Sequence, residues 1–110
     1  RFVGDRGILC VLRLSVDIEQ RLEQSIQKTL AGPYLKADPT LLQEILAAVR
    51  SVMGSREHAA FPPPILTTIK LRRYLRKLVE LEFPSLQVLS FGDLLGDLDI
   101  QVVHEISVPS

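Results

Sequence analysis

The sequence is poor in cysteine and aromatic residues, and neither charge is in excess. It contains 1 cysteine, no tryptophan and 5% aromatic residues, and its 13 lysines and arginines balance 13 aspartates and glutamates. A single cysteine excludes an internal disulfide and a cysteine-rich zinc centre, and it is typical of a reducing compartment such as the cytoplasm. A net charge of zero gives no long-range attraction for nucleic acid or anionic lipid. Any electrostatic function must therefore be local.

Long apolar runs and a secretion signal are also missing. No segment approaches the roughly 20 consecutive apolar residues that a membrane-spanning helix requires. After Arg1 there is no basic stretch that is followed by an apolar run and a cleavage site. With 110 residues, 46% of them hydrophobic and 24% charged, the composition is that of one ordinary globular domain. We expect residues 1–110 to form a single water-soluble domain that is cut from a longer protein.

Motifs of enzymes and nucleotide-binding proteins are absent from the sequence. There is no GxSxG, GxxxxGK or GxGxxG pattern, and Gly4 and Gly7 precede an apolar strand, whereas a phosphate-binding loop follows one. Cys10 lies among apolar residues, where we expect a covered and inert thiol. We therefore expect no enzyme activity and no cofactor.

Histidines and clustered aspartates are the remaining candidates for a metal site. His58 lies in a proline-rich stretch and His104 in a predicted strand, and neither has further ligands at a suitable spacing. Asp93, Asp97 and Asp99 fall in one predicted turn, but their spacing does not match a helix-flanked calcium loop. We expect no metal ion here and interpret the aspartates as a solvated turn.

The first half of the chain predicts one strand and two helices. Residues 8–14 are apolar on both faces apart from one arginine, which is typical of a strand covered on both sides. Apolar residues then recur at every fourth position from Ile18 to Leu30, which predicts a helix that Gly32 ends. The Asp-Pro pair at 38–39 begins a second helix that stops at Gly54.

The second half predicts short strands around a third helix. Residues 55–64 have no period and end in three adjacent prolines, which predicts a flexible, extended connection. A short strand at 65–67, a helix that ends by Phe83 and a short strand at 88–90 follow. Residues 100–108 alternate, with the even-numbered positions from 100 to 106 on one face, as in a half-exposed edge strand.

These elements indicate an α/β fold. Their order is strand, helix, helix, strand, helix, strand, strand, which favours a small, mostly parallel sheet with helices packed on it. We expect the last strand to lie at an edge of this sheet.

The third predicted helix carries an unusual charge pattern. Its first turn is basic and its last turn acidic, opposite to the preference set by the helix dipole. Arg72 with Arg76 and Arg73 with Lys77 are like-charge pairs at i,i+4, each of which costs about 0.2–0.5 kcal/mol. The stability of the isolated helix therefore does not explain this pattern.

Two interpretations of these cations remain open. In the first, acids of neighbouring elements such as Glu19, Glu23 or Glu44 balance a solvated face. In the second, the cations meet an acidic surface on an adjacent domain or subunit. Our candidate partner-binding residues are Arg72, Arg73, Arg76 and Lys77.

The run from Ile65, ILTTIKLRRYLRKLVELEFPSLQVLSFGDLLGDLDIQVV, resembles the C-terminal end of the export-gate proteins of bacterial type III secretion, the SctV and FlhA family. The resemblance is carried by a strand before an arginine-rich helix, the Phe83-Pro84 stop, and Val-Leu-Ser at 88–90 followed by an aromatic residue and an acid. Upstream, a leucine-rich strand before DIEQRLEQSI and an Asp-Pro turn also fit. The similarity covers about residues 8–106 and favours the injectisome branch.

This resemblance implies a polytopic inner-membrane protein whose large cytoplasmic region assembles into a nonameric ring. It implies that the present chain is the last subdomain, on the cytoplasmic side of the membrane, and that it has no catalytic role. The implied partners are neighbouring subdomains and subunits, together with export substrates, chaperones or gatekeeper proteins. The subdomain is expected to move relative to its neighbours and so to open or close a cleft.

Two other classes of function compete with this one. A nucleic-acid-binding module could use the basic third helix, but the zero net charge and the few aromatic residues disfavour nucleic acid as a partner. An enzyme on a doubly wound sheet would place its site at the strand ends, near Ser15, Thr67, Thr68 and Ser90. No phosphate loop and no base paired with a nucleophile accompanies these hydroxyls.

Overall fold

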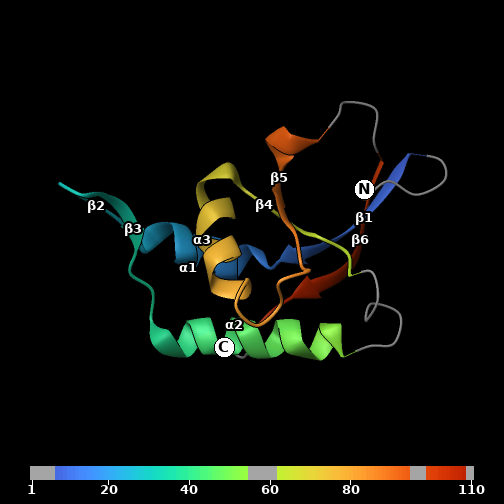
Figure 1. Cartoon of the computed structure of the whole chain (residues 1–110), viewed down its shortest axis with the longest axis horizontal. Helices are drawn as coiled ribbons and strands as arrows, with labels where there is room; N and C mark the ends of the chain where they lie inside the picture. The colour runs from blue at the N-terminus through green and yellow to red at the C-terminus, as the bar shows by residue number, and fades with distance from the viewer. Residues whose placement is uncertain (1–6, 55–61, 95–98, 109–110) are drawn as a thin grey trace.

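The computed structural model describes residues 7–54, 62–94 and 99–108. Its centre is a four-stranded sheet in the order β5-β4-β1-β6, and every neighbouring pair of strands is parallel (Figure 1). The strands are β1 (Ile8–Leu14), β4 (Ile65–Thr67), β5 (Val88–Ser90) and β6 (Asp99–Ile106). The predicted fold class, a small parallel sheet with helices packed on it, is confirmed.

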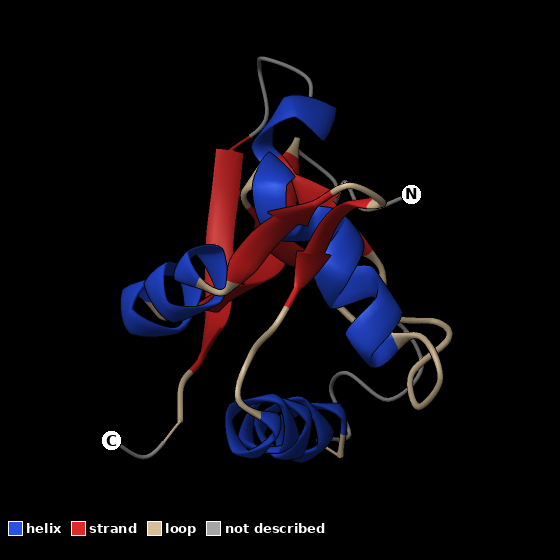
Figure 2. Cartoon of the chain, turned by 90° about the vertical axis from the view of Figure 1, so that its left-hand side faces the viewer, coloured by secondary structure: helices blue, strands red, loops and turns tan. Residues whose placement is uncertain are grey.

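Three helices pack against one face of this sheet: α1 (Val16–Gln24), α2 (Pro39–Met53) and α3 (Ile69–Val79). Leu12 and Leu14 of β1 lie in the main core with buried residues of all three helices. Leu9 and Val11 form a smaller cluster with Leu66, and strand alternation places this cluster on the opposite face. Both views put α2 along one end of the molecule, at the bottom (Figures 1 and 2).

A β-hairpin replaces the second half of the predicted first helix. Because α1 ends at Gln24, the prediction of a helix up to Leu30 was wrong. The antiparallel strands β2 (Ile26–Thr29) and β3 (Gly32–Leu35) project away from the sheet at the left of Figure 1. The order of elements is therefore strand, helix, hairpin, helix, strand, helix, strand, strand, and not the order that the sequence predicted.

Local chemistry explains why the helix stops early and the chain turns. The Ser25 hydroxyl donates a hydrogen bond back to the Arg21 carbonyl, at 2.8 Å, where α1 ends. At the hairpin turn the Thr29 hydroxyl donates to the Gly32 carbonyl, also at 2.8 Å. Gly32 has a φ of 111°, which residues with a side chain rarely adopt. Leu30, which a helical stripe would have buried, is fully exposed at the turn.

The second and third predicted helices are confirmed. Asp38 caps α2, because its carboxylate accepts a hydrogen bond from the Thr40 amide at 3.0 Å. The third helix ends at Val79, earlier than the predicted stop at Phe83, and turns follow it. Thr68 occupies the N-cap position of α3, but its hydroxyl makes no capping hydrogen bond.

The proline-rich connection lies only partly within the described chain. Residues 55–61 of the predicted connection at 55–64 are outside the described residues, so its flexibility stays a prediction. Pro63 and Pro64 are buried. The Pro64 carbonyl accepts a hydrogen bond from the Leu12 amide at 2.8 Å, which fixes the end of the connection against β1.

The last strand, β6, lies at an edge of the sheet as predicted. Its pairing with β1 skips one residue, because Val11 is opposite Val102 whereas Leu12 is opposite His104. This bulge interrupts the predicted alternation of faces. Of the 8 residues of β6 only Ile106 is buried, so the strand is more exposed than the expected half-covered strand.

The expectation of a covered thiol at Cys10 was wrong. Cys10 is exposed, although it lies in β1, which has a neighbouring strand on each side. The residues that β1 contributes to the main core, Leu12 and Leu14, lie in the second half of the strand. The packed helices therefore cover the end of β1 and leave its beginning open.

No helix in the described ranges 7–54, 62–94 and 99–108 is long and apolar enough to cross a bilayer.

Candidate partner-binding groove

The four candidate cations occupy two sides of α3. Buried residues at a spacing of four, Leu71, Leu75 and Val79, hold the helix against the core. Of the candidate residues, Arg72 and Arg76 reach toward β5 and the turn before it, whereas Arg73 and Lys77 line surface cavities beside the β2–β3 hairpin.

Arg72 joins α3 to β5 and to the turn that follows it. Its Nε donates a hydrogen bond to the Val88 carbonyl at 3.2 Å and lies 3.0 Å from a carboxylate oxygen of Asp93. The same carboxylate accepts hydrogen bonds from the Ser90 amide at 2.8 Å and the Ser90 hydroxyl at 3.1 Å. Hydrogen bonds from Ser90, together with the nearby Arg72 charge, lower the pKa of Asp93. This carboxylate is thus part of the internal structure.

Arg76 makes a second link of the same kind. One of its terminal nitrogens donates to the Leu86 carbonyl at 2.9 Å, and its Nε is 3.7 Å from Glu80 in the same helix. Arg72 and Arg76 therefore hold α3 against the segment that leads into β5. Of the four candidates, these two already have partners inside the chain.

Two of the three acids expected to balance the cations, Glu19 and Glu23, have other contacts. Glu19 accepts a hydrogen bond from Arg13 at 3.2 Å and one from the Thr67 hydroxyl at 3.0 Å. Glu23 accepts a hydrogen bond from the Thr68 hydroxyl, also at 3.0 Å. These bonds join α1 to the end of β4 and the start of α3. Glu23 also lines a cavity together with Lys70 and Arg73 of α3.

Two adjacent cavities run between α3, the hairpin and α2. The first has a volume of about 460 Å³ and the second about 340 Å³, and Pro33 and Tyr74 line both. We call the two together the basic groove. Their lining residues are Glu23, Ile26, Lys28, Pro33, Tyr34, Leu35, Leu42, Ile69, Lys70, Arg73, Tyr74, Lys77 and Leu78.

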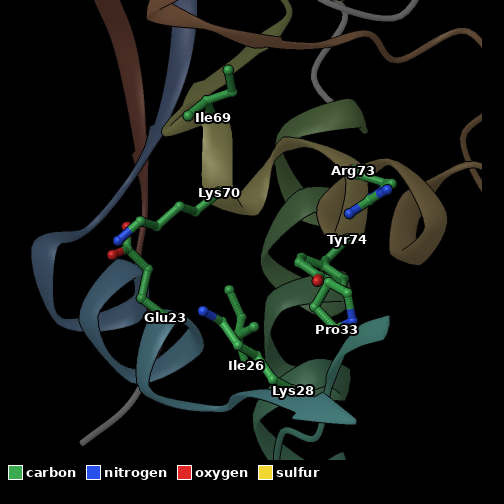
Figure 3. Close-up of a pocket in the computed structure, with 8 residues that line it drawn as sticks. All are labelled: Glu23, Ile26, Lys28, Pro33, Ile69, Lys70, Arg73 and Tyr74. Carbon is green, nitrogen blue, oxygen red and sulfur yellow. The ribbon is translucent and has the colours of Figure 1, made fainter. Parts of the chain in front are cut away.

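The groove is lined by charged and apolar side chains together. Its rims carry four cations and one acid, namely Lys28, Lys70, Arg73, Lys77 and Glu23. In Figure 3 Lys70 and Glu23 extend toward each other on one side of the first cavity, and Tyr74 and Pro33 lie close together on the other. Such a surface is suited to a ligand that brings negative charge and apolar side chains together.

Tyr74 is the central aromatic residue of the groove. It is half-buried and borders both cavities. The guanidinium of Arg73 lies 5.6 Å from the centre of its ring, within range of a cation–π contact. Arg73 itself is exposed, so its charge remains at the surface beside the Tyr74 ring.

Sequence reasoning found one wall of the groove and missed the other. The α3 cations stood out by their spacing, but Lys28 was assigned to the predicted first helix and Pro33 to the stop after it. The two turn residues between Thr29 and Gly32 are leucine and alanine, so the glycine- or asparagine-containing turn that favours a two-residue hairpin is missing from the sequence.

The hydroxyls considered for catalysis have structural hydrogen-bond partners. The Ser15 side chain accepts from the Ile18 amide at 3.2 Å and so caps α1. Thr67 and Thr68 donate to glutamates of α1, and Ser90 donates to Asp93. No group of three or more histidine, cysteine, aspartate or glutamate side chains that could hold a metal ion occurs among the described residues. His58 and Asp97 lie outside those residues.

Comparison with known proteins gives the chain its family. The model of the FHIPEP family matches residues 1–99. The chain belongs to the FHIPEP family. Among curated members, the hypersensitivity response secretion protein HrcV of Ralstonia nicotianae is 32% identical over 104 residues, which are 94% of this chain and 15% of that protein. The family expected from the sequence resemblance is confirmed.

Solved structures of family members share this fold. The complex of the Chlamydia pneumoniae CdsV and CdsO proteins contains a chain that matches with a TM-score of 0.84 and 35% identity, over 96% of this chain and 31% of that one. The cryo-EM structure of nonameric EPEC SctV-C matches with a TM-score of 0.82 and 30% identity, over 96% of this chain and 31% of that one. The present chain spans about 15% of the length of curated relatives such as HrcV.

Proposed function

We propose that this FHIPEP-family chain is a non-catalytic interaction subdomain of the inner-membrane export gate of a bacterial type III secretion system, on the cytoplasmic side. The observation that carries this proposal is the family match over residues 1–99, together with the similarity to the nonameric SctV-C. The subdomain contributes to a cytoplasmic ring and to docking of proteins that approach the gate. Movement relative to neighbouring subdomains opens or closes the cleft that receives them.

The basic groove is the docking site in this proposal. Its ligand is an acidic surface with at least one apolar side chain, presented by an export substrate, a chaperone or a gatekeeper protein. Arg73 and Lys77 supply charge from α3, and Lys28 supplies it from the hairpin. Tyr74 and Pro33 supply apolar contact surface. The complex of CdsV with CdsO supports a docking role, because that relative has been solved with a partner bound.

The experiment is a charge reversal in the whole parent protein. Arg73→Glu and Lys77→Glu should weaken binding of purified chaperone–substrate complexes, measured by calorimetry, because both cations lie on the rim of the groove. Arg21→Glu is the matched control, since Arg21 is a cation on α1 that lines neither cavity. The solution mass of each variant is measured in parallel.

The outcomes separate docking from assembly. Loss of binding at unchanged solution mass supports the docking groove. Loss of the ring assigns Arg73 and Lys77 to the contact between subunits instead. If both binding and ring formation survive in the double variant, the groove is not a partner site. Salt-sensitive binding of random duplex DNA by the unmodified protein would favour the nucleic-acid alternative.

A further inference from the structure

The two cavities of the basic groove differ in their lining. Of the eight described residues around the first cavity, four are charged, namely Glu23, Lys28, Lys70 and Arg73. Of the seven described residues around the second cavity, Lys77 alone is charged, and the other six are leucines, tyrosines and a proline. The groove therefore has a charged half and an apolar half.

The apolar half is built on the margin of the main core. Leu35 of β3, Leu42 of α2 and Leu78 of α3 line the second cavity, and each is half-buried and packed against the core. The hydroxyl of Tyr34 donates a hydrogen bond to the side-chain oxygen of Gln27 at 3.1 Å, so it has a partner within the hairpin. A pocket of this composition is suited to one large aliphatic or aromatic side chain.

Positive charge is uneven along the charged half. In Figure 3 Glu23 and Lys70 lie at one side of the first cavity, whereas Arg73 lies at the other side with Tyr74. The Glu23 carboxylate is held in place by a hydrogen bond of 3.0 Å from the Thr68 hydroxyl. Because the charges of Glu23 and Lys70 offset each other, a carboxylate of a ligand is drawn to Arg73, at the Tyr74 side.

The attractive charge and the apolar half adjoin each other at Tyr74. This residue borders both cavities, and Arg73 and Lys77 stand on either side of it in α3. The two cations are four residues apart, which is about 6 Å along a helix axis. An extended chain covers that distance with about two residues. A carboxylate at Arg73 and an apolar side chain in the second cavity therefore fit within one short segment.

We propose that the basic groove binds a short linear segment of a partner protein, in which a large apolar side chain and a carboxylate are separated by about one to three residues. The apolar side chain enters the second cavity, and the carboxylate pairs with Arg73. Glu23 determines specificity, because its charge repels segments whose acids lie farther from the apolar residue. This assignment rests on the docking function proposed above, and it adds the order of the groups within the ligand.

The probe is a phage-displayed library of random short peptides, from which the solubilised full-length protein selects binders. The unmodified protein should enrich acids close to a large apolar residue. Arg73→Glu should abolish the enrichment of acids, and Tyr34→Ala, which changes the second cavity alone of the two, should abolish that of the apolar residue. Leu30→Ala is the matched control, since Leu30 is fully exposed on the same hairpin and lines neither cavity.

One selected peptide is then measured by fluorescence anisotropy, where changes in the peptide cannot unfold the protein. Serine in place of its apolar residue should weaken binding to the unmodified protein about tenfold, and binding to the Tyr34→Ala protein by less. A second version carries its acid farther from the apolar residue. Glu23→Gln should raise the affinity for this version about threefold and leave that for the selected peptide within about twofold.

Several results would overturn the proposal. They are selection of acids without a nearby apolar residue, selection of apolar residues without acids, no selection at all, and equal effects of Tyr34→Ala and Leu30→Ala. An unchanged preference in the Glu23→Gln protein would remove Glu23 as the specificity residue. Docking itself is decided separately by calorimetry with chaperone–substrate complexes, which can bind the groove through a folded surface. The linear segment can therefore fail as the ligand while the docking function stands.

Discussion

The two sides of α3 carry the same charges and have different surroundings. On the side toward β5, Arg72 and Arg76 donate hydrogen bonds to main-chain carbonyls at 3.2 and 2.9 Å. On the side toward the hairpin, Arg73 and Lys77 line open cavities. In the sequence each side is a pair of cations at i,i+4, so nothing local distinguishes them.

The difference teaches that a basic helix can serve two purposes at once. The β5 side uses its charge to attach the helix to a short strand, and the hairpin side keeps its charge available at the surface. We therefore expect substitutions on the two sides to separate stability from binding. Four experiments test this separation.

The largest effect is expected from charge reversal on the hairpin side. Arg73→Glu with Lys77→Glu should weaken binding of an acidic partner by about 2 kcal/mol, or roughly thirtyfold, because two attractions become repulsions. The free energy of unfolding, measured by urea titration, should change by no more than about 0.5 kcal/mol, as is usual for surface substitutions. A larger loss of stability would mean that this side is structural too.

Neutralisation of the β5 side should show the opposite behaviour. Arg72→Met with Arg76→Met removes two hydrogen bonds to carbonyls and should lower the free energy of unfolding by about 1–2 kcal/mol. Solvent screening limits the effect, since the two side chains are 49% and 39% exposed. Affinity for the partner, measured on folded protein, should stay within about twofold of the original. A strong loss of affinity would place these arginines in the docking site.

A smaller effect is expected from the hairpin turn that supports the second wall of the groove. Gly32→Ala should destabilise the domain by about 1 kcal/mol, because an L-residue is strained at φ 111°. No atom lies within 4 Å of the added methyl group, so the cost is conformational and not steric. Gly54→Ala is the control, since Gly54 has an ordinary φ of −73°. Equal thermal melting of the two variants would contradict this account.

The smallest effect is expected from acid titration of Asp93. Its pKa is lowered by the hydrogen bonds from Ser90 and by Arg72, so its contribution to stability is present above its ordinary pKa of 3.8. That contribution disappears as the pH falls through the lowered value. Asp93→Asn should therefore be less stable than the original at neutral pH, and the difference should shrink in acid. Urea titrations at several pH values measure this, and a constant difference would exclude the assigned cause.

Much of the fold could be predicted because periodicity and burial agree. The apolar run at 8–14 predicted a strand, and β1 spans Ile8–Leu14 with a neighbouring strand on each side, although the exposed Cys10 shows that its beginning is not covered on both faces. The leucines of the third predicted helix, Leu71, Leu75 and Leu78, were expected to face inward, and Leu71 and Leu75 are buried whereas Leu78 is half-buried. Both signals come from residues that are close together in the sequence, and the packing of the core favours the same structure.

The hairpin could not be predicted from the same signal. Ile18 and Leu22 are buried in α1, and Ile26 continues their spacing although it begins β2. Leu30 continues it too, although it lies in the hairpin turn, so a spacing of four alone does not distinguish this hairpin from a helix. The register of β6 was missed for a related reason, because a bulge between two strands far apart in the sequence leaves no local mark.

Half of the candidate site was identified from the sequence. The four cations were selected by their charge pattern, but their division depends on Val88, Leu86 and Asp93, which are not adjacent to them in the chain. The other wall of the groove depends on the hairpin. Tertiary structure decides which of the four cations bond within the domain and which remain available to bind a partner. A helical wheel does not contain that information.

The pairing of β1 with β6 has a consequence for the synthesis of the protein. The longest ladder of the sheet joins its first strand to its last, so β1 can acquire this neighbour only after nearly the whole domain has left the ribosome. Contacts between such distant segments form slowly, and until β6 pairs with it, the unpaired edge of β1 is a place where nascent chains can associate. A chaperone that holds the emerging chain would act at this step, and truncations before Asp99 should accumulate as insoluble protein.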